Sequence, residues 1–334
     1  MTNKVAFFYL HGTDPLIARV GQIVGDVFSQ PRLGLLTVPG INGITATWQD
    51  GSPRNDCFPN LLDPNIFEAK KIGYPALGFP MSVSLGIGIT NLRNAIGALP
   101  SGQRWMVGGY SQGAAAASQI LRDIATGGVL ASRASTFLGG AVFGNPRRPG
   151  GNYRGEVGGT WSGAWDDPGS TTGGHGSFPT TGTYSRLTNA ECDPTKWIEL
   201  TEEGDIFSST GDTPRGINWT EGNAAFIDLL NLPAILAAID GFADIQAAFD
   251  LGGALEDFTD FVGRAFQIGG NGHAAYPWRP PPGDPAGGMT SYQIAASWLT
   301  GKANAYAVAP DVLPAVPTAT STSGWTTTLI PPAA

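Results

Sequence analysis

A serine in a glycine-flanked turn is the strongest chemical signal in the sequence. The pentapeptide GYSQG at residues 109–113 matches the pattern G-x-S-x-G. An apolar segment precedes it and an alanine-rich segment follows, which is the strand and helix context that this pattern requires. The hydroxyl of Ser111 would then stand at the end of a strand and at the start of a helix. A glycine-rich turn with an ordinary N-cap serine is the alternative, and we predict that Ser111 is a nucleophile.

A serine nucleophile needs a base, and histidine is the usual one. The chain has three candidates, His11, His175 and His273. Where G-x-S-x-G serves as the nucleophile turn, the acid and then the histidine follow it along the chain. His175 comes before the best acid candidate and sits in a glycine-rich loop, so we predict His273. The alternative for His273 is a loop histidine that caps the next helix.

The acid should follow a strand that comes after the nucleophile. Asp205 follows the apolar segment WIEL through a short turn, which fits. Its alternative role is a turn aspartate that bonds its own backbone. The rival carboxylates are Asp166, Asp167, Asp193 and Asp212. Asp193 precedes WIEL and would therefore fall at the wrong edge of a sheet.

The negative oxygen that forms when a serine attacks a carbonyl carbon needs hydrogen-bond donors. The first should be the backbone N–H of Gln112, the residue after the nucleophile. The second should come from the turn His11-Gly12-Thr13, where Thr13 offers an N–H and a hydroxyl, and His11 shapes the turn. A plain strand-to-helix turn is the alternative. Too few histidines and cysteines are present to favour a zinc site, and we expect no metal and no cofactor.

Strand and helix patterns alternate along the first 200 residues. Short apolar runs predict strands at Val5–Leu10, Lys71–Tyr74, Arg104–Gly108, Phe137–Phe143 and Trp197–Leu200. Helical spacing is present at Ser82–Leu99, Ser111–Ala125 and Thr290–Leu299. This alternation predicts an α/β fold with a mostly parallel sheet of about five strands. Together with the G-x-S-x-G turn, it fits the α/β-hydrolase class.

Residues 222–268 break the alternation with three apolar helical runs, Ala224–Leu232, Pro233–Phe249 and Leu255–Phe266. We expect this helical insertion to lie within a catalytic domain of residues 1–302, followed by a Pro/Thr/Ala-rich tail at 303–334. Apolar helical stripes usually pack on a core. The alternative is that some stay exposed and receive acyl chains. The candidates for substrate contact are Tyr110, Phe226, Leu229 and Leu230.

Composition narrows the function further. The net charge of −8 argues against a nucleic-acid partner, which would need a basic surface. The first residues lack the features of a signal peptide, and no run of about 18 apolar residues predicts a membrane span. The two cysteines, Cys57 and Cys192, are compatible with free thiols or with one bridge.

Three segments together resemble the cutinase-like serine esterases, and among them the lysin B esterases of mycobacteriophages. They are GYSQG after a strand, Gly-Asn-Pro at 144–146 after the next strand, and Glu-Gly-Asp-Ile-Phe at 203–207 after the fifth. The resemblance implies a Ser111, Asp205 and His273 triad, with Thr13 and Gln112 as oxyanion donors. It also implies hydrolysis of the ester that joins mycolic acids to arabinogalactan, by an enzyme made in the host cytoplasm that acts on the envelope at lysis. The long glycine-rich loop at 147–190 departs from a minimal domain of this family.

Three other functions remain open at this point. A general lipase or cutinase-like carboxylesterase would use the same triad on other lipid esters. An acyltransferase would replace water with an alcohol. A wall-binding module on an inactive hydrolase fold is the third, and an intact Ser, Asp and His in the expected order argues against it.

Overall fold

A five-stranded parallel sheet forms the centre of the molecule in the computed structural model. The structure describes residues 4–12, 58–76, 81–150, 174–202, 204–227, 273, 275–277, 280 and 288–308. The strands are β1 (Val5–Leu10), β2 (Phe67–Lys71), β3 (Trp105–Tyr110), β4 (Phe137–Phe143) and β5 (Trp197–Leu200). Their order is β2-β1-β3-β4-β5, and all neighbouring pairs are parallel. The predicted α/β-hydrolase sheet is therefore confirmed.

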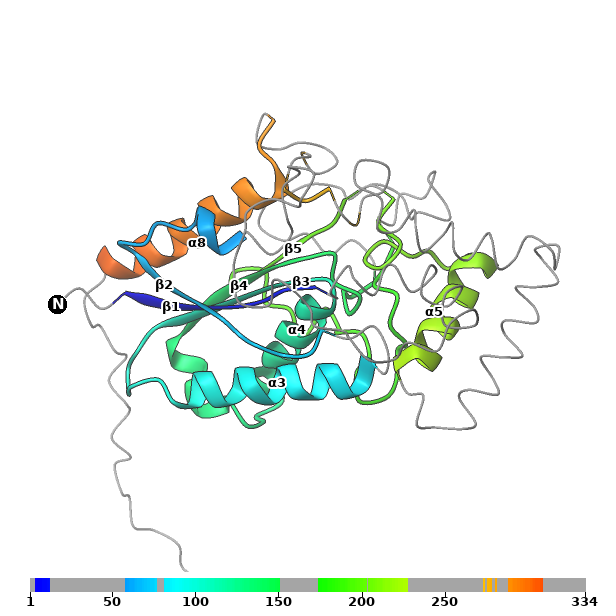
Figure 1. Ribbon diagram of the computed structural model, residues 1–334, viewed down its shortest axis with the longest axis horizontal. Helices are drawn as coiled ribbons and strands as arrows, with labels where there is room; N and C mark the ends of the chain where they lie inside the picture. Colours follow the sequence, from blue (N-terminus) through cyan, green and yellow to red (C-terminus); the bar gives the residue numbers. More distant parts are fainter. Residues whose placement is uncertain are drawn as a thin grey trace, which may run out of the picture.

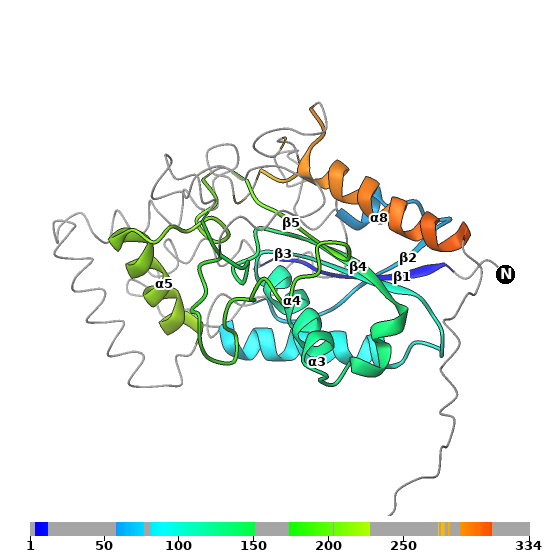
Figure 2. The same cartoon turned by 180° about the vertical axis from the view of Figure 1, so that it is seen from behind.

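Helices cover both faces of this sheet (Figures 1 and 2). Helices α3 (Met81–Gly97) and α4 (Gln112–Ala125) pack together on one face. Helix α8 (Ser291–Val308) and the 3-10 turn η1 (Phe58–Leu61) lie on the other. The short turn η2 (Ala131–Thr136) leads into β4, and α5 (Pro214–Ile227) lies beyond the carboxyl edge of the sheet.

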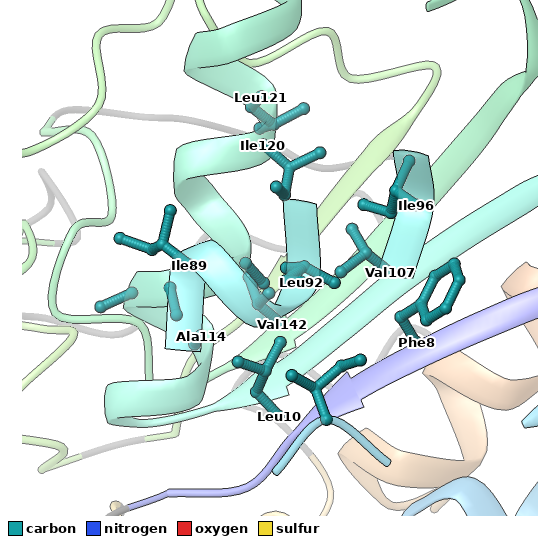
Figure 3. Close-up of a cluster of buried hydrophobic side chains, with 14 of the residues drawn as sticks. Phe8, Leu10, Ile89, Leu92, Ile96, Val107, Ala114, Ile120, Leu121 and Val142 are labelled. Atoms are coloured by element: carbon teal, nitrogen blue, oxygen red, sulfur yellow. The ribbon is translucent and has the colours of Figure 1, made fainter. Parts of the chain in front are cut away.

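The side chains of each strand alternate between two buried apolar clusters. From β1, Phe8 and Leu10 enter the cluster beneath α3 and α4, whereas Phe7 and Tyr9 enter the cluster beneath α8. Figure 3 shows the first cluster, in which residues of β1, β3 and β4 meet side chains of α3 and α4. A strand buried on both faces gives a continuous apolar run in the sequence. This explains why four of the five strands were found at or near their predicted positions.

Three predicted elements need correction. The second strand is Phe67–Lys71 and not Lys71–Tyr74. It is an edge strand whose residues after Phe67 are exposed or half-buried, so it lacks an apolar run. Helix α8 continues past Leu299 to Val308 and so enters the segment predicted as a tail. Alanine is a strong helix former even without periodicity, and Arg104 stacks on the ring of Tyr306 at 3.4 Å.

The third correction concerns the helical insertion. Helix α5 begins at Pro214, ten residues before the predicted start at Ala224. A proline at the first position of a helix fits its fixed φ angle, but two internal glycines weaken the helical pattern. The predicted runs Pro233–Phe249 and Leu255–Phe266 lie outside the described residues, as does the tail beyond 308.

The structure also bears on the predictions about membrane spans and cysteines. Among the helices of the described ranges, none combines the length and the hydropathy needed to cross a bilayer. Cys192 is a buried free thiol, and burial raises its pKa above the ordinary value. Cys57 lies outside the described residues.

Candidate active site

The turn between β3 and α4 holds Ser111 in a strained conformation. Its φ and ψ angles are 54° and −120°, a region that residues other than glycine rarely adopt. A Cβ atom at Gly109 would overlap the backbone of Gly113, and one at Gly113 would overlap the carbonyl oxygens of Leu10 and His11. Both glycines are therefore required for the strand and helix to approach this closely. The Ser111 hydroxyl makes no helix-capping hydrogen bond, so it is not an ordinary N-cap.

Ser111, His273 and Asp205 form one chain of hydrogen bonds. The Ser111 hydroxyl donates to Nε2 of His273 at 2.8 Å. The other ring nitrogen, Nδ1, donates to Oδ1 of Asp205 at 2.9 Å. All three residues are buried. The structure thus brings together the three residues singled out in the sequence, although 162 positions separate Ser111 from His273.

The buried carboxylate of Asp205 is kept ionised by its neighbours. Burial by itself raises the pKa of Asp205, but the adjacent imidazole of His273 and its hydrogen bond lower it. Hydrogen bonds from the Tyr276 hydroxyl and the Phe207 N–H lower it further, and the net pKa lies below the ordinary value. An ionised carboxylate at this place orients the imidazole and stabilises its protonated form.

The region expected to hold the oxyanion lies at the carboxyl ends of β1 and β3. The chain leaves β1 toward β2 on one side, and β3, β4 and β5 follow on the other. Such a switch in strand order leaves a crevice where ligands bind in parallel sheets. Gln112 is the first residue of α4, where backbone N–H groups favour negative charge. Its side-chain Oε1 accepts a hydrogen bond from Ser84 of α3 at 3.1 Å.

The loop after β1 passes directly beside Ser111. A Cβ atom placed on Gly12 would come within 3.1 Å of the Ser111 Cβ. His11 donates from Nδ1 to the Gly12 carbonyl at 2.7 Å, and the Tyr74 hydroxyl donates to the His11 carbonyl. These contacts fit the role in turn shaping predicted for His11. Thr13, the second predicted oxyanion donor, lies outside the described residues.

The rival residues that the structure describes, Asp193, Asp212 and His175, have partners outside the hydrogen-bonded chain from Ser111 to Asp205. His175 pairs with Asp212 at 3.2 Å, and its Nδ1 donates to its neighbour's carbonyl, that of Gly176. Asp193 accepts from the backbone and the hydroxyl of Thr195 before β5 begins. Asp166 and Asp167 lie outside the described residues.

The residues suggested for substrate contact are only partly described. Tyr110 is buried, and its hydroxyl donates to the His273 carbonyl at 2.7 Å. This contact holds His273 next to the turn that carries Ser111, while substrate contact by Tyr110 stays a prediction. Leu229, Leu230 and the side chain of Phe226 lie outside the described residues.

No pattern in the sequence predicted the polar network around the turn that follows β4. Asn145, which follows β4, donates to Glu199 at 2.9 Å and to the Ser118 hydroxyl at 2.8 Å. Trp197 also donates to Glu199, and burial nevertheless raises the pKa of Glu199 to about 7. Arg147 is buried and donates to the Ser185 carbonyl at 2.8 Å. These contacts fix the turn after β4, which passes beside His273.

Comparisons with known proteins identify a solved structure with a similar fold. No family model matches the sequence, and no curated protein matches it significantly. The crystal structure of lysin B from mycobacteriophage D29 is similar, with a TM-score of 0.56 and 19% identity over 89% of this chain and 99% of that one. A cutinase-like protein from Cryptococcus sp. has a TM-score of 0.37 and 13% identity over 71% and 94% of the two chains. The chain therefore shares the fold of lysin B from mycobacteriophage D29, the α/β-hydrolase fold predicted from the sequence.

Proposed function

We propose that this protein is a serine esterase that hydrolyses the ester between mycolic acids and arabinogalactan in the mycobacterial cell wall during phage lysis. The observation that carries the esterase part is the hydrogen-bonded chain from Ser111 through His273 to Asp205. The fold shared with lysin B supports a lysin B-like esterase over other ester hydrolases in this proposal. The sequence resemblance described above supplies the wall ester as the substrate.

The geometry fits acyl transfer through a covalent intermediate. The Ser111 oxygen attacks the ester carbonyl while Nε2 of His273 takes the hydroxyl proton. The negative carbonyl oxygen is held by the backbone N–H of Gln112 and by Thr13. Collapse of the tetrahedral intermediate expels the sugar alcohol, which takes the proton from His273. The acyl group stays bound to Ser111 as the acyl-enzyme. A water molecule deprotonated by His273 then releases the fatty acid and restores the serine.

Asp205 stays ionised through this cycle. Its carboxylate accepts the Nδ1 proton of His273, which leaves Nε2 as the basic nitrogen that faces Ser111. When Nε2 becomes protonated, the buried negative charge offsets the new positive one. This division of roles follows from the two distances on opposite sides of one imidazole ring.

The test is ester cleavage by the native protein and by Ser111→Ala. Hydrolysis of a p-nitrophenyl ester and release of mycolic acids from purified mycolyl-arabinogalactan are measured in parallel. Ser101→Ala, an exposed serine in a turn, is the matched control and should retain both activities. Circular dichroism confirms that each variant is folded.

The outcomes separate the candidate functions. Loss of both activities in Ser111→Ala, with both retained in Ser101→Ala, supports the proposal. Cleavage of the small ester without mycolate release would favour a general lipase or cutinase-like esterase. Transfer of the acyl group to an added sugar in preference to water would favour an acyltransferase. A folded native protein that cleaves neither substrate would refute the proposal.

A further inference from the structure

The carboxylate of Asp205 is held by donors of two kinds. Oδ1 accepts from the Phe207 N–H at 2.8 Å, and Oδ2 accepts from the Ser208 hydroxyl at 2.8 Å. These donors lie two and three positions from Asp205 and move with it. The hydroxyl of Tyr276 also donates to Oδ2, from a segment 71 positions away. Only a donor that is distant in the sequence, such as Tyr276, can fix the carboxylate relative to another part of the chain.

Tyr276 lies three positions after His273. The two side chains therefore reach the two oxygens of one carboxylate from one short segment, His273 at Oδ1 and Tyr276 at Oδ2. With two points of attachment, the carboxylate cannot turn away from the imidazole without breaking the bond to the phenol. With the imidazole alone, rotation of the carboxylate relative to the segment would meet less resistance.

The phenol is itself held in place. Its oxygen accepts a hydrogen bond from the Glu202 N–H at 3.3 Å, so its proton is directed to Asp205. Its ring packs edge-on against those of Tyr110 and Phe143, at 6.0 and 5.9 Å between centroids. Burial, and then the charge of Asp205, raise the pKa of Tyr276 well above its ordinary value, so the hydroxyl stays a donor at all working pH values.

We propose that Tyr276 is a positioning residue of the triad, whose hydroxyl fixes the Asp205 carboxylate in the orientation that receives the Nδ1 proton of His273. The inference rests on the proposed function, since it concerns the same three residues. Tyr276 acts through Asp205 and touches no reacting atom. Removing the hydroxyl should therefore slow the chemical step and leave substrate binding unchanged.

The test compares Tyr276→Phe with Tyr9→Phe. Tyr9 is a buried tyrosine of the same apolar cluster, and its hydroxyl lies 3.5 Å from that of Tyr292. We expect Tyr276→Phe to lower kcat on a p-nitrophenyl ester about tenfold, as for loss of one hydrogen bond to a charged group, with KM unchanged. Tyr9→Phe should keep the native kcat. Equal kcat values for Tyr276→Phe and the native protein would overturn the inference.

A second readout needs no substrate. The proton on Nδ1 of His273 should give a downfield proton NMR resonance, assigned by its loss in Asp205→Asn. Tyr276→Phe should shift or broaden this resonance, and Tyr9→Phe should not. A resonance identical to the native one in Tyr276→Phe would refute the positioning role, whether or not the protein cleaves esters. A native protein without esterase activity but with a shifted resonance in the variant would refute the proposed function alone.

A variant that keeps the hydroxyl covers a failure of Tyr276→Phe to fold. Incorporation of 3,5-difluorotyrosine at position 276 leaves the ring and the oxygen in place and makes the hydroxyl a stronger donor. The His273 resonance should then shift from its native position. No shift in a folded protein would overturn the inference.

Discussion

Replacing Gly144 with alanine would place a methyl group between the side chains of His273 and Asp205. Gly144 follows β4 with φ at +57°, and its N–H donates to the Leu200 carbonyl at 3.1 Å. A Cβ atom there would lie 2.9 Å from Cε1 and Nδ1 of His273 and 3.0 Å from Oδ2 of Asp205. Neither group can yield without moving relative to the other.

The expected loss follows from these distances. Ordinary van der Waals contact begins at about 3.4 Å, so the imidazole or the carboxylate must move by about 0.5 Å or more. A misplacement of about 1 Å in a catalytic group costs about a hundredfold in rate. We therefore expect kcat/KM to fall between about tenfold and a hundredfold. In addition, the left-handed backbone lowers the free energy of unfolding by about 1–2 kcal/mol for any residue other than glycine.

The assay separates the two effects with a matched variant. Gly102 has φ at +77°, and a Cβ atom there would meet nothing within 4 Å. Gly102→Ala should lose only the backbone contribution, about 1–2 kcal/mol in urea unfolding, and keep the native kcat/KM on a p-nitrophenyl ester. The reasoning fails if Gly144→Ala keeps the native kcat/KM, or if Gly102→Ala loses as much activity as Gly144→Ala.

Three further predictions follow from burial and from the rejected base. The folded-state pKa of Glu199, about 7, exceeds its ordinary value of 4.5, so the free energy of unfolding should fall by about 3 kcal/mol through this group as the pH rises from 4.5 to 7. Glu199→Gln should remove that fall, and urea unfolding at both pH values measures it; an unchanged pH dependence would contradict it. The buried Cys192 thiol should not react with a thiol reagent in a folded Cys57→Ser variant and should react after unfolding; rapid labelling of the folded protein would show the burial to be wrong. His273→Gln should lose at least about a thousandfold in kcat, whereas His175→Gln should stay within a few-fold of native in the same ester assay, and the reverse ranking would transfer the role of base to His175.

The parts of this site that the sequence could predict are those set by strand ends. Ser111 and Asp205 each follow a buried, mainly apolar strand, so their edge of the sheet was predictable. The choice of His273 came from its order along the chain, and the hydrogen bond to Ser111 agrees with it. β2 was misplaced because its burial is confined to few positions at the sheet edge.

The supporting contacts could not be predicted in the same way. The bond from Tyr276 to Asp205 joins positions 71 residues apart, and the bond from Tyr110 to the His273 carbonyl joins positions 163 apart. Such pairs depend on how irregular segments cross above the sheet, and no periodic pattern marks them. The Asn145 and Glu199 pair is similar, because a lone buried glutamate in a strand reads as an exposed one until its partners are known.

The order of the triad along the chain has a consequence for synthesis. All five strands of the sheet, Ser111 and Asp205 emerge from the ribosome before His273, and α8, which packs on the second face of the sheet, emerges after it. Chains grow from the N-terminus, and contacts between distant positions form late because closing a long loop costs entropy. A nascent chain with a complete sheet therefore still lacks His273, the base in our proposal, and the helix over its second apolar cluster. If the proposed function holds, joining His273 to Ser111 and Asp205 and covering the second apolar cluster both require residues 273–308, so a chain that ends before them should cleave no ester.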